Sequence, residues 1–227
     1  FLMKIIIFGD VHGDIYSLET LFKTTDADAY MCIGDLVGDG PHGEQCLNLA
    51  IDKCGIDNVI QGNHEKFYID GKVDRKCSDL ARSSFNISYQ RFAVTTRENW
   101  RTDSLDILKQ LQQSIELEFN SKKVVLSHTF GNRYIYPDTK IDFDIKGDIN
   151  IFGHTHVQFI KFSKSRTLVG TGSLGMNKHD KEIAQYITLY PDDFTVECCT
   201  FSSPKERLIQ DMKTLNYPSA VIEYYLQ

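Results

Sequence analysis

The sequence lacks paired cysteines. Its 227 residues include six cysteines, and no two of them stand in a C-x-x-C arrangement. A zinc site built from thiolates is therefore not expected. We expect most of the six thiols to serve as small core residues in a reducing compartment. They are Cys32, Cys46, Cys54, Cys77, Cys198 and Cys199.

Runs of lysine and arginine are also missing. The chain has 25 Lys and Arg residues against 31 Asp and Glu residues, which gives a formal net charge of -6. Sequence-independent binding of nucleic acid needs clustered basic side chains, so a nucleic-acid partner is not expected. The acidic balance still allows a phosphate-containing substrate that is held by metal ions.

The apolar start of the chain is too short to be a membrane segment. The stretch "FLMKIIIF" has fewer than half the residues of a membrane span and lacks the layout of a signal peptide. We therefore expect a cytoplasmic protein with no membrane partner. Hydrophobic residues make up 41% of the chain and charged residues 25%, as in ordinary globular domains.

The first 65 residues alternate between strand and helix patterns. Strands are predicted at Lys4–Phe8 and Ala29–Ile33, and a third strand is predicted to end at Val59–Gln61. Helices are predicted between them, at Ile15–Lys23 and Glu44–Lys53. This βαβαβ order indicates a parallel sheet with right-handed crossovers.

The rest of the chain falls into three parts. Residues 66–114 are polar and helix-like, and we expect them to cover one side of the fold or to form a partial cap. Residues from about 115 to 200 form strand patterns, and the tail from 203 to 227 looks helical. The strand patterns are "SIELEFN", "KKVVLSH", "DINIFGH", "HVQFIKF", "RTLVGTG", "AQYITLY" and "FTVECCT". With no repeat and no linker, we expect one domain over residues 1–227.

Five apolar runs end in glycine or serine and are followed by side chains that can bind metal ions. The side chains after them are Asp10 and His12, Asp35, Asn63 and His64, His128, and His154 and His156. In open α/β sheets the ligand site lies outside the carboxyl ends of the strands, so these five ends can converge. Glycine suits such positions because the chain turns sharply and comes close to a bound group.

The side chains in this set have a consistent chemistry. Oxygen from Asp and Asn together with nitrogen from His suits divalent Mn, Fe, Zn, Ni or Co. Seven candidates exceed the needs of one tetrahedral ion but fit two ions that share a carboxylate. The candidates are Asp10, His12, Asp35, Asn63, His128, His154 and His156. Two divalent ions would give the pocket a net positive charge and attract a phosphate.

The motifs resemble those of a known superfamily. "GDVHG", "GDLVGDG", "GNHE", "SHT" and "GHTH" occur in the order of the calcineurin-like metallophosphoesterases, over roughly residues 3–200. The stretches "GDGP" and "GSLG" make the chain similar to the small bacterial and archaeal phosphodiesterases in particular. The resemblance implies an α/β fold, a four-layer αββα sandwich of two mixed β-sheets flanked by helices.

The resemblance also implies a role for each residue. One ion would be held by Asp10, His12 and His156, and the other by Asn63, His128 and His154. Asp35 would bridge the two ions, and His64 would protonate the leaving oxygen or steady the developing charge. The implied reaction is hydrolysis of a phosphodiester by metal-activated hydroxide, with Mn2+ as the first choice of ion.

Two motifs depart from the superfamily pattern. Serine/threonine protein phosphatases continue the second motif with Asp-Arg-Gly, whereas this chain has Val37-Gly38-Asp39. A phosphate-binding arginine is thus missing, which argues against a protein phosphatase. The fourth motif usually reads His-Gly, and here Thr129 follows His128. The threonine either narrows access to the site or only alters a turn.

Several residues have two interpretations. Gly172 and Ser173 present an amide or hydroxyl to phosphate, or they form a tight turn. His42 lies near the pocket mouth or has no role in the site. Asp14 orients His12 or, as we favour, caps a helix. Asp39 touches substrate through water or is a solvated loop carboxylate.

Other functions fit the same motifs. A phosphomonoesterase or a dinucleotide-polyphosphate hydrolase would use the same metal site. A nuclease would need a basic groove, and a non-catalytic scaffold of this fold would have degraded ligand motifs. A homo-oligomer is compatible with the tyrosine-rich end "EYYLQ".

Overall fold

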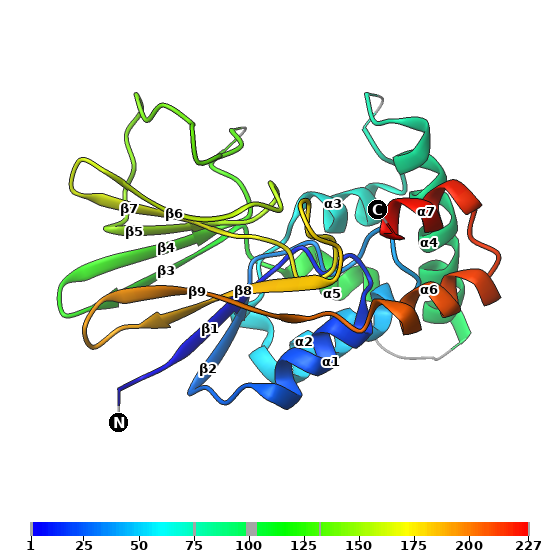
Figure 1. Ribbon diagram of the computed structural model, residues 1–227, viewed down its shortest axis with the longest axis horizontal. Coiled ribbons are helices and arrows are strands. Elements are labelled where there is room, and N and C mark those ends of the chain that lie inside the picture. Colours follow the sequence, from blue (N-terminus) through cyan, green and yellow to red (C-terminus); the bar gives the residue numbers. More distant parts are fainter. Residues whose placement is uncertain (1, 75, 99–103, 132, 227) are drawn as a thin grey trace.

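The protein folds as two β-sheets packed face to face, with most helices gathered beside the first sheet (Figure 1). The structure, a computed structural model, describes residues 2–74, 76–98, 104–131 and 133–226, without the side chains of 93–98. The mixed α/β sandwich with flanking helices that the sequence predicts is confirmed. No helix in the described ranges is long and apolar enough to cross a membrane.

The first sheet has the strand order β2-β1-β8-β9. Its strands are β1 (Ile5–Phe8), β2 (Ala29–Cys32), β8 (Ile183–Tyr190) and β9 (Thr195–Ser202). β1 and β2 are parallel, as the βαβ pattern predicts, whereas β8 joins β1 antiparallel. The carboxyl ends of β1 and β2 therefore lie at the same edge of the sheet.

The second sheet has the order β3-β4-β5-β7-β6. Its strands are β3 (Ser114–Phe119), β4 (Lys122–Ser127), β5 (Ile149–Phe152), β6 (Gln158–Ser163) and β7 (Arg166–Thr171). β4, β5 and β7 run parallel, and the two edge strands β3 and β6 are antiparallel to their neighbours. The carboxyl ends of β4 and β5 also meet at one rim.

The third strand predicted near Val59–Gln61 is reduced to two isolated bridges. Val59 pairs with Cys32 and Ile60 with Gln112, each in parallel. The chain passes the edge of β2 only briefly, because helix α3 begins at Asn63. No regular strand forms in this part of the described chain.

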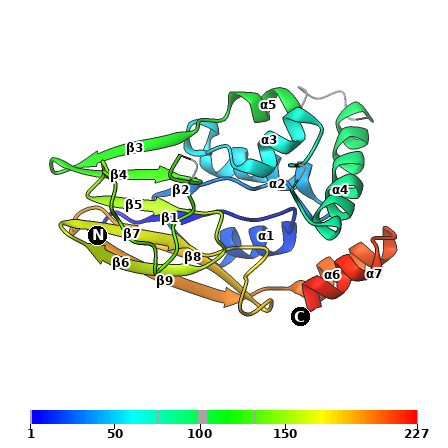
Figure 2. The same ribbon diagram turned by 90° about the horizontal axis from the view of Figure 1, so that it is seen from above.

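The helices cover the first sheet and extend beyond its edge (Figure 2). They are α1 (Ile15–Thr24), α2 (Gly43–Cys54), the 3-10 turn η1 (Ile56–Asn58), α3 (Asn63–Asp70), α4 (Asp79–Glu98), α5 (Ser104–Gln110), α6 (Lys205–Thr214) and α7 (Ser219–Leu226). Asp14 caps α1 by accepting a hydrogen bond from the Ser17 backbone N–H at 3.1 Å, as we favoured.

Strand β1 is buried on both faces and forms the centre of the molecule. Ile5 and Ile7 face the second sheet, and Ile6 and Phe8 face helices α1 and α2. Burying a side chain of this size contributes roughly 1.5–3 kcal/mol. A continuous apolar run is what a strand between two layers needs, since neither of its faces meets water.

The outer face of the second sheet is covered by irregular chain. Ile135 and Ile145, from the segment 129–148, pack on Phe152, Phe159 and Leu168. This segment links the parallel strands β4 and β5, where a helical crossover would be usual. The outer layer here differs from the helical layer expected of an αββα sandwich, because the segment lacks a helical repeat of apolar residues.

Asn150 interrupts the apolar run of β5, but both of its side-chain polar groups are hydrogen-bonded. Its side chain is 2% exposed, yet its amide nitrogen donates to the Gly147 carbonyl at 2.8 Å and its oxygen accepts from the Gly147 N–H at 3.1 Å. A buried amide is tolerated when its hydrogen bonds are satisfied. The asparagine thus fixes the turn that leads into β5.

Candidate metal centre

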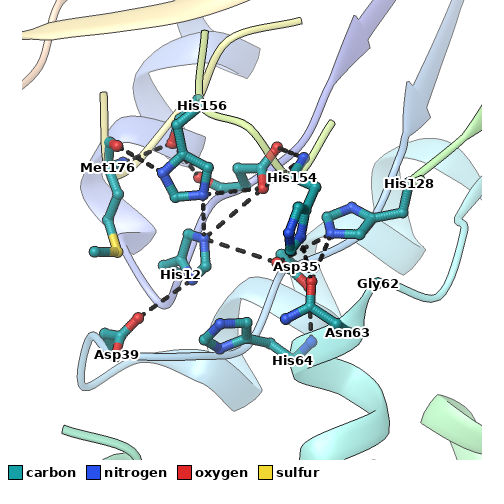
Figure 3. Close-up of polar contacts among 12 residues, drawn as sticks. His12, Asp35, Asp39, Gly62, Asn63, His64, His128, His154, His156 and Met176 are labelled. Carbon is teal, nitrogen blue, oxygen red and sulfur yellow. Dashed lines mark hydrogen bonds and ion pairs between the residues drawn. The ribbon is translucent and has the colours of Figure 1, made fainter. Parts of the chain in front are cut away.

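The seven predicted ligands converge at the rim where both sheets end (Figure 3). Asp10 and His12 follow β1, Asp35 follows β2, Asn63 begins α3, His128 follows β4, and His154 and His156 follow β5. The first three residues come from the first sheet, and the three histidines at the end come from the second. The site is therefore built across the sandwich.

The first ligand set consists of Asp10, His12 and His156. The Nε2 atom of His156 lies 3.0 Å from Nε2 of His12 and 3.1 Å from Oδ1 of Asp10. The three ligand atoms all lie within 4.8 Å of one another. Three donor atoms this close can share one cation.

The second ligand set surrounds the Asn63 side chain. Its oxygen lies 2.9 Å from Nε2 of His128 and 2.7 Å from Nδ1 of His154. Asp35, His128 and His154 also offer ligand atoms within 4.8 Å of one another. These four residues can hold a second cation.

Asp35 lies between the two sets. Its Oδ2 atom is 3.2 Å from Nε2 of His128 and 3.9 Å from Nε2 of His12. Its other oxygen, Oδ1, accepts a hydrogen bond from the backbone N–H of His64 at 2.8 Å. One oxygen is thus fixed by the chain, and the other faces both sets of ligands.

The histidine tautomers fit metal binding. Nδ1 of His128 donates to the Ile33 carbonyl at 2.9 Å, and Nδ1 of His156 donates to the Met176 carbonyl at 2.8 Å. A carbonyl only accepts, so each Nδ1 carries the proton and each Nε2 presents a lone pair in the neutral ring. A carbonyl that accepts from the other ring nitrogen orients a histidine ligand in a metal site. The donor set therefore fits divalent cations.

The buried carboxylates make the site attract positive charge. Asp10 and Asp35 are 0% and 1% exposed. Burial lowers the pKa of His128, but the Asp35 carboxylate outweighs burial and raises that pKa to about 10, so a cation that binds Nε2 would displace a proton from this ring. Burial raises the pKa of Asp35, yet His128 and His64 hold it well below its usual range. Cations at this site would satisfy both carboxylates.

His64 lies beside the ligand sets. Its ring centre is 4.5 Å from that of His12, edge to face, and among the described residues its buried Nδ1 has no hydrogen-bond partner. Gly38 makes room for both rings, since a Cβ atom there would lie 2.6 Å from Nδ1 of His12 and 2.8 Å from Nδ1 of His64. The backbone of Gly38 also has φ +151°. Only glycine fits this position.

Glu65 supports the site, although the sequence analysis gave it no role. Its buried carboxylate accepts from the backbone N–H groups of Asp35 at 2.8 Å, Leu36 at 2.7 Å and Val37 at 3.1 Å. It also accepts from the N–H of Gly62 at 2.7 Å. The only signal in the sequence was its place after His64 in "GNHE". Glu65 ties the chain after β2 to the start of α3.

Asp39 is a second residue near the ligand sets, and the sequence left two interpretations of it open. Its Oδ2 atom lies 3.5 Å from Nδ1 of His12, and its side chain is 14% exposed. The carboxylate therefore contacts a candidate metal ligand and is more than a solvated loop residue. The contact is an ion-pair distance and not a hydrogen bond, because Nδ1 of His12 has no hydrogen-bond partner among the described residues.

The weaker candidates have other contacts. Ser173 donates to the Asp10 carbonyl and accepts from the Met176 N–H, both at 2.7 Å, so its hydroxyl serves the tight turn that includes Gly172. His42 pairs with Asp211 at 2.9 Å. Thr129 donates to the Gly131 carbonyl at 2.8 Å. These contacts favour structural interpretations of all four.

Five candidate ligands have left-handed backbones. Their φ angles are 52° at Asp10, 50° at His12, 54° at Asp35, 68° at His154 and 56° at His156. Residues other than glycine rarely adopt this conformation, which costs of order 1–3 kcal/mol each. Half of the ten non-glycine residues with positive φ in the described chain are candidate ligands, and strain of this kind at a cluster of polar residues points to function.

An open cleft lies beside the second ligand set. It has a volume of about 580 Å³, and its lining includes the polar residues Asn63 and His128, the apolar residues Val125 and Phe130, and the charged residues Lys66, Lys146 and Glu116. The cleft gives a phosphate group access to the ligand sets from solvent. The two lysines make this entrance compatible with anions.

Comparison with known sequences agrees with this geometry. The sequence model of the calcineurin-like phosphoesterase superfamily domain matches residues 3–193. An uncharacterised protein of Methanocaldococcus jannaschii is 26% identical over 186 residues, which are 78% of this chain and 72% of that protein.

Solved structures share the fold. A metallophosphoesterase from Sphaerobacter thermophilus matches with a TM-score of 0.78 at 19% identity, over 100% of this chain and 99% of the other. A hypothetical protein from Pyrococcus horikoshii OT3 matches with a TM-score of 0.77 at 13% identity, over 99% of this chain and 98% of that one. A phosphoesterase from E. coli reaches a TM-score of 0.51 at 13% identity, over 88% and 100%.

Proposed function

The chain belongs to the calcineurin-like phosphoesterase superfamily and is a phosphoesterase; from that premise we propose that it hydrolyses phosphodiesters with two divalent metal ions. The observation that carries the proposal is the position of Asp35 Oδ2, 3.2 Å from His128 and 3.9 Å from His12. One oxygen that faces two sets of ligands fits a bridge between two ions.

Each ligand set has its own ion in this proposal. Asp10, His12 and His156 would hold one ion, and Asn63, His128 and His154 the other, with Asp35 shared. Such ions, when bound, neutralise charge on the phosphoryl oxygens and lower the pKa of water. We propose Mn2+ as the natural ion, because mixed carboxylate, amide and imidazole ligands suit it.

His64 would act on the leaving group. The hydrogen bond from its backbone N–H to Asp35 fixes the start of α3, and its ring packs edge to face on His12 of the first ligand set. The ring nitrogen, the His12 ring and the Asp39 carboxylate offer atoms within 4.8 Å of one another. A histidine held in this way can donate a proton to the leaving oxygen, a step that contributes typically 10²–10⁴-fold.

A diester is the proposed substrate, rather than a monoester. The second motif lacks the Asp-Arg-Gly of the protein phosphatases, and Asp39 in the stretch that replaces it places a carboxylate next to the first ligand set. A carboxylate disfavours the second negative charge that a phosphomonoester carries. We further propose that the chain acts as a single domain in the cytoplasm, on a small substrate, and that homo-oligomers are compatible with this activity.

A dinucleotide polyphosphate is the second candidate substrate. Lys66 and Lys146 line the cleft beside the second ligand set, where additional phosphates of such a substrate would pass. Lys66 also pairs with Asp70 at 2.9 Å, which reduces its positive charge for a ligand. Release of ATP or ADP from diadenosine tetraphosphate, faster than cleavage of a simple diester, would favour this candidate.

The test is a rate comparison on protein that is stripped with chelator and then given Mn2+. The substrates are bis-p-nitrophenyl phosphate and p-nitrophenyl phosphate. We expect metal-dependent cleavage that favours the diester. Faster cleavage of the monoester would make the protein a phosphatase, and two bound ions without cleavage of any ester would contradict an enzymatic role.

His64→Ala tests the proton donor in the same assay. We expect kcat to fall by about a hundredfold or more while both ions stay bound, because His64 is not a ligand. His179→Ala, at an exposed histidine, is the matched control and should keep the parent rate. Metal content by elemental analysis separates loss of chemistry from loss of ions. Equal kcat values in His64→Ala and the parent would contradict the role of His64 as proton donor.

A further inference from the structure

The open cleft has candidate ligands in its own lining. Asn63 and His128 both line it, so a molecule in the cleft touches two residues of the second ligand set. The chain that follows His128 forms part of the same wall, through Thr129, Phe130 and Gly131. A phosphate on the second ligand set therefore has space for its organic group next to this part of the chain.

The same stretch of chain turns back and places a tyrosine on another ligand of the set. Phe130 and Arg133 form an antiparallel bridge, in which each backbone N–H donates to the carbonyl of the other residue, at 3.1 and 3.0 Å. Tyr134 comes next, and its ring centre lies 4.1 Å from that of His154, with an angle of 31° between the ring planes. Nδ1 of this histidine is the atom that lies 2.7 Å from the Asn63 oxygen. Tyr134 therefore borders the second ligand set directly.

One face of the Tyr134 ring is open. The residue is 53% exposed. Among the described residues, His154 is the only ring that contacts it. With one face on the imidazole and half of the residue exposed, the opposite face of the ring is turned to solvent. Aromatic rings attract one another beyond the area that they bury, so this face can bind a ring of a ligand.

The backbone around Tyr134 is held in place from both sides. Before it, the ring centre of Phe130 lies 4.8 Å from that of Phe143 and 6.2 Å from that of Phe152. After it, Ile135 is buried in the same apolar cluster. A ligand that stacks on Tyr134 therefore meets a side chain whose backbone is already ordered, which lowers the cost of binding.

We propose that Tyr134 determines specificity by stacking on a planar aromatic ring of the substrate, while the phosphate of the same molecule lies on the ligand sets. This inference rests on the proposed phosphoesterase function and narrows its substrate class to phosphoesters that carry a nucleobase or an aryl group. Stacking on an aromatic side chain tolerates many ring types, because every planar ring has a π-face. The contact thus selects for planar groups.

The test measures the binding of phenylphosphonate and methylphosphonate to the Mn2+-loaded protein by equilibrium dialysis. Neither compound has an ester bond that could be cleaved, and both carry the same phosphonate group. We expect the parent to bind phenylphosphonate about fivefold or more tightly, the lower end of what stacking of one base on an aromatic side chain gives. In Tyr134→Ala the ratio of the two dissociation constants should fall towards one. Tyr134→Phe keeps a ring and should keep the ratio.

Phe162→Ala is the matched control. It removes an aromatic ring that is 79% exposed, near the end of β6 that is farther along the chain from His156. It should keep the parent ratio. A ratio near one in the parent, or the parent ratio in Tyr134→Ala, would overturn the proposal. If Tyr134→Ala bound both phosphonates equally weakly and lost Mn2+, the tyrosine would only orient His154, and the proposal would also be wrong.

A second pair of ligands, adenosine monophosphate and ribose 5-phosphate, identifies the kind of ring. The two compounds share a sugar phosphate and differ in the base. A ratio of dissociation constants larger than that of the phosphonates, and lost in Tyr134→Ala, would assign a nucleobase to Tyr134. A larger ratio for the phosphonates would assign an aryl group.

A failure of the proposed function would be seen separately, because dialysis does not depend on cleavage. If the protein cleaves no ester but its preference for phenylphosphonate depends on Tyr134, the stacking contact stands without the reaction. Cleavage of bis-p-nitrophenyl phosphate without any such preference would leave the reaction intact and refute the contact. A Mn2+-loaded protein that binds none of the four ligands and cleaves no ester would refute both.

Discussion

A single carboxylate, that of Glu65, holds four backbone N–H groups from two segments that form the metal centre. Hydrogen bonds to a charged group are worth about 1.5–3 kcal/mol each. Glu65→Gln replaces one acceptor oxygen with a donor that faces other donors. We expect the free energy of unfolding to fall by roughly 3 kcal/mol or more, with loss of bound Mn2+, as measured by urea unfolding and elemental analysis.

Glu116→Gln is the control for this prediction. Its carboxylate is 46% exposed and pairs with Lys123 on the surface. Exposed ion pairs contribute about 0–1 kcal/mol, so this variant should unfold almost as the parent does. If Glu65→Gln were no less stable than Glu116→Gln, the supporting role of Glu65 would be wrong.

Gly38 is a second residue whose effect can be predicted. In Gly38→Ala the new methyl group would lie 2.6 Å from Nδ1 of His12 and 2.8 Å from Nδ1 of His64, so one ring must move. We expect kcat to drop by at least about tenfold, because small displacements of catalytic groups are costly. Gly55→Ala, with φ +77° and nothing within 4 Å of the added Cβ, has similar backbone strain without the clash. Equal losses of kcat in both variants would refute the steric explanation.

The sequence predicts the residues that the structure brings together at the candidate metal centre, but not the side chains that contact them. Each candidate ligand directly follows an apolar run, and parallel strands bring such positions together. Glu65 accepts a hydrogen bond from the backbone of Leu36, and Asp39 lies 3.5 Å from the ring of His12. Such contacts depend on the folded chain rather than on spacing in the sequence. Local patterns therefore indicate the ligands and leave out the residues that orient them.

Helix α6 contacts the core through a buried ion pair, in addition to its apolar contacts and the pair between Asp211 and His42. Nζ of Lys205 lies 2.8 Å from Oδ2 of Asp14 and also donates to the Gly175 carbonyl. Lys205 is 6% exposed. Lys205→Met leaves the Asp14 charge buried and unpaired, and loss of one partner of a buried pair costs about 3–5 kcal/mol. We expect a loss of that size in the free energy of unfolding, measured in urea.

Two further variants decide whether the ion pair is the cause. Lys213→Met changes an exposed lysine of the same helix and should have little effect. The double variant Asp14→Asn with Lys205→Met removes the unpaired charge and should recover part of the stability. A loss in the double variant equal to the sum of the two single losses would argue against coupling between the two side chains.

The sequence predicts the regular strands and helices better than the short bridges at a sheet edge and the irregular segments that cover a sheet. The strands of both sheets follow from alternating or continuous apolar runs. Residues 59–61 form bridges instead of a strand, because the chain turns into α3 after only two paired residues. The segment 129–148 covers the second sheet through Ile135 and Ile145, two apolar residues without a helical spacing. Tertiary packing decides such segments.

The candidate metal centre joins the two sheets. Asp10 and Asp35 come from the ends of the first sheet, and His128 and His154 from the ends of the second. Ions bound here would therefore stabilise the packing of the sheets. At a free Mn2+ concentration one hundred times the dissociation constant, binding to the folded state alone adds about 2.7 kcal/mol.

We therefore expect Mn2+ to raise the unfolding temperature of chelator-treated protein, as measured by calorimetry. Asp35→Asn should lose most of this increase, because the oxygen that faces both ligand sets loses its charge. Asp148 lies before the start of β5, at the end of the strand opposite the site, and pairs with Arg166. Asp148→Asn should therefore keep the increase in unfolding temperature. An increase in Asp35→Asn as large as in the parent would contradict a shared ligand.

The left-handed backbones of the candidate ligands affect how this protein can evolve. At Asp10, His12, Asp35, His154 and His156, glycine would relieve the conformational cost that the present side chains carry. If selection acted only on thermal stability, glycines would accumulate at these positions, and the protein would lose its activity as its stability rose. The site persists only as long as its reaction is under selection, so its decay in a lineage would be a sign that the substrate has disappeared.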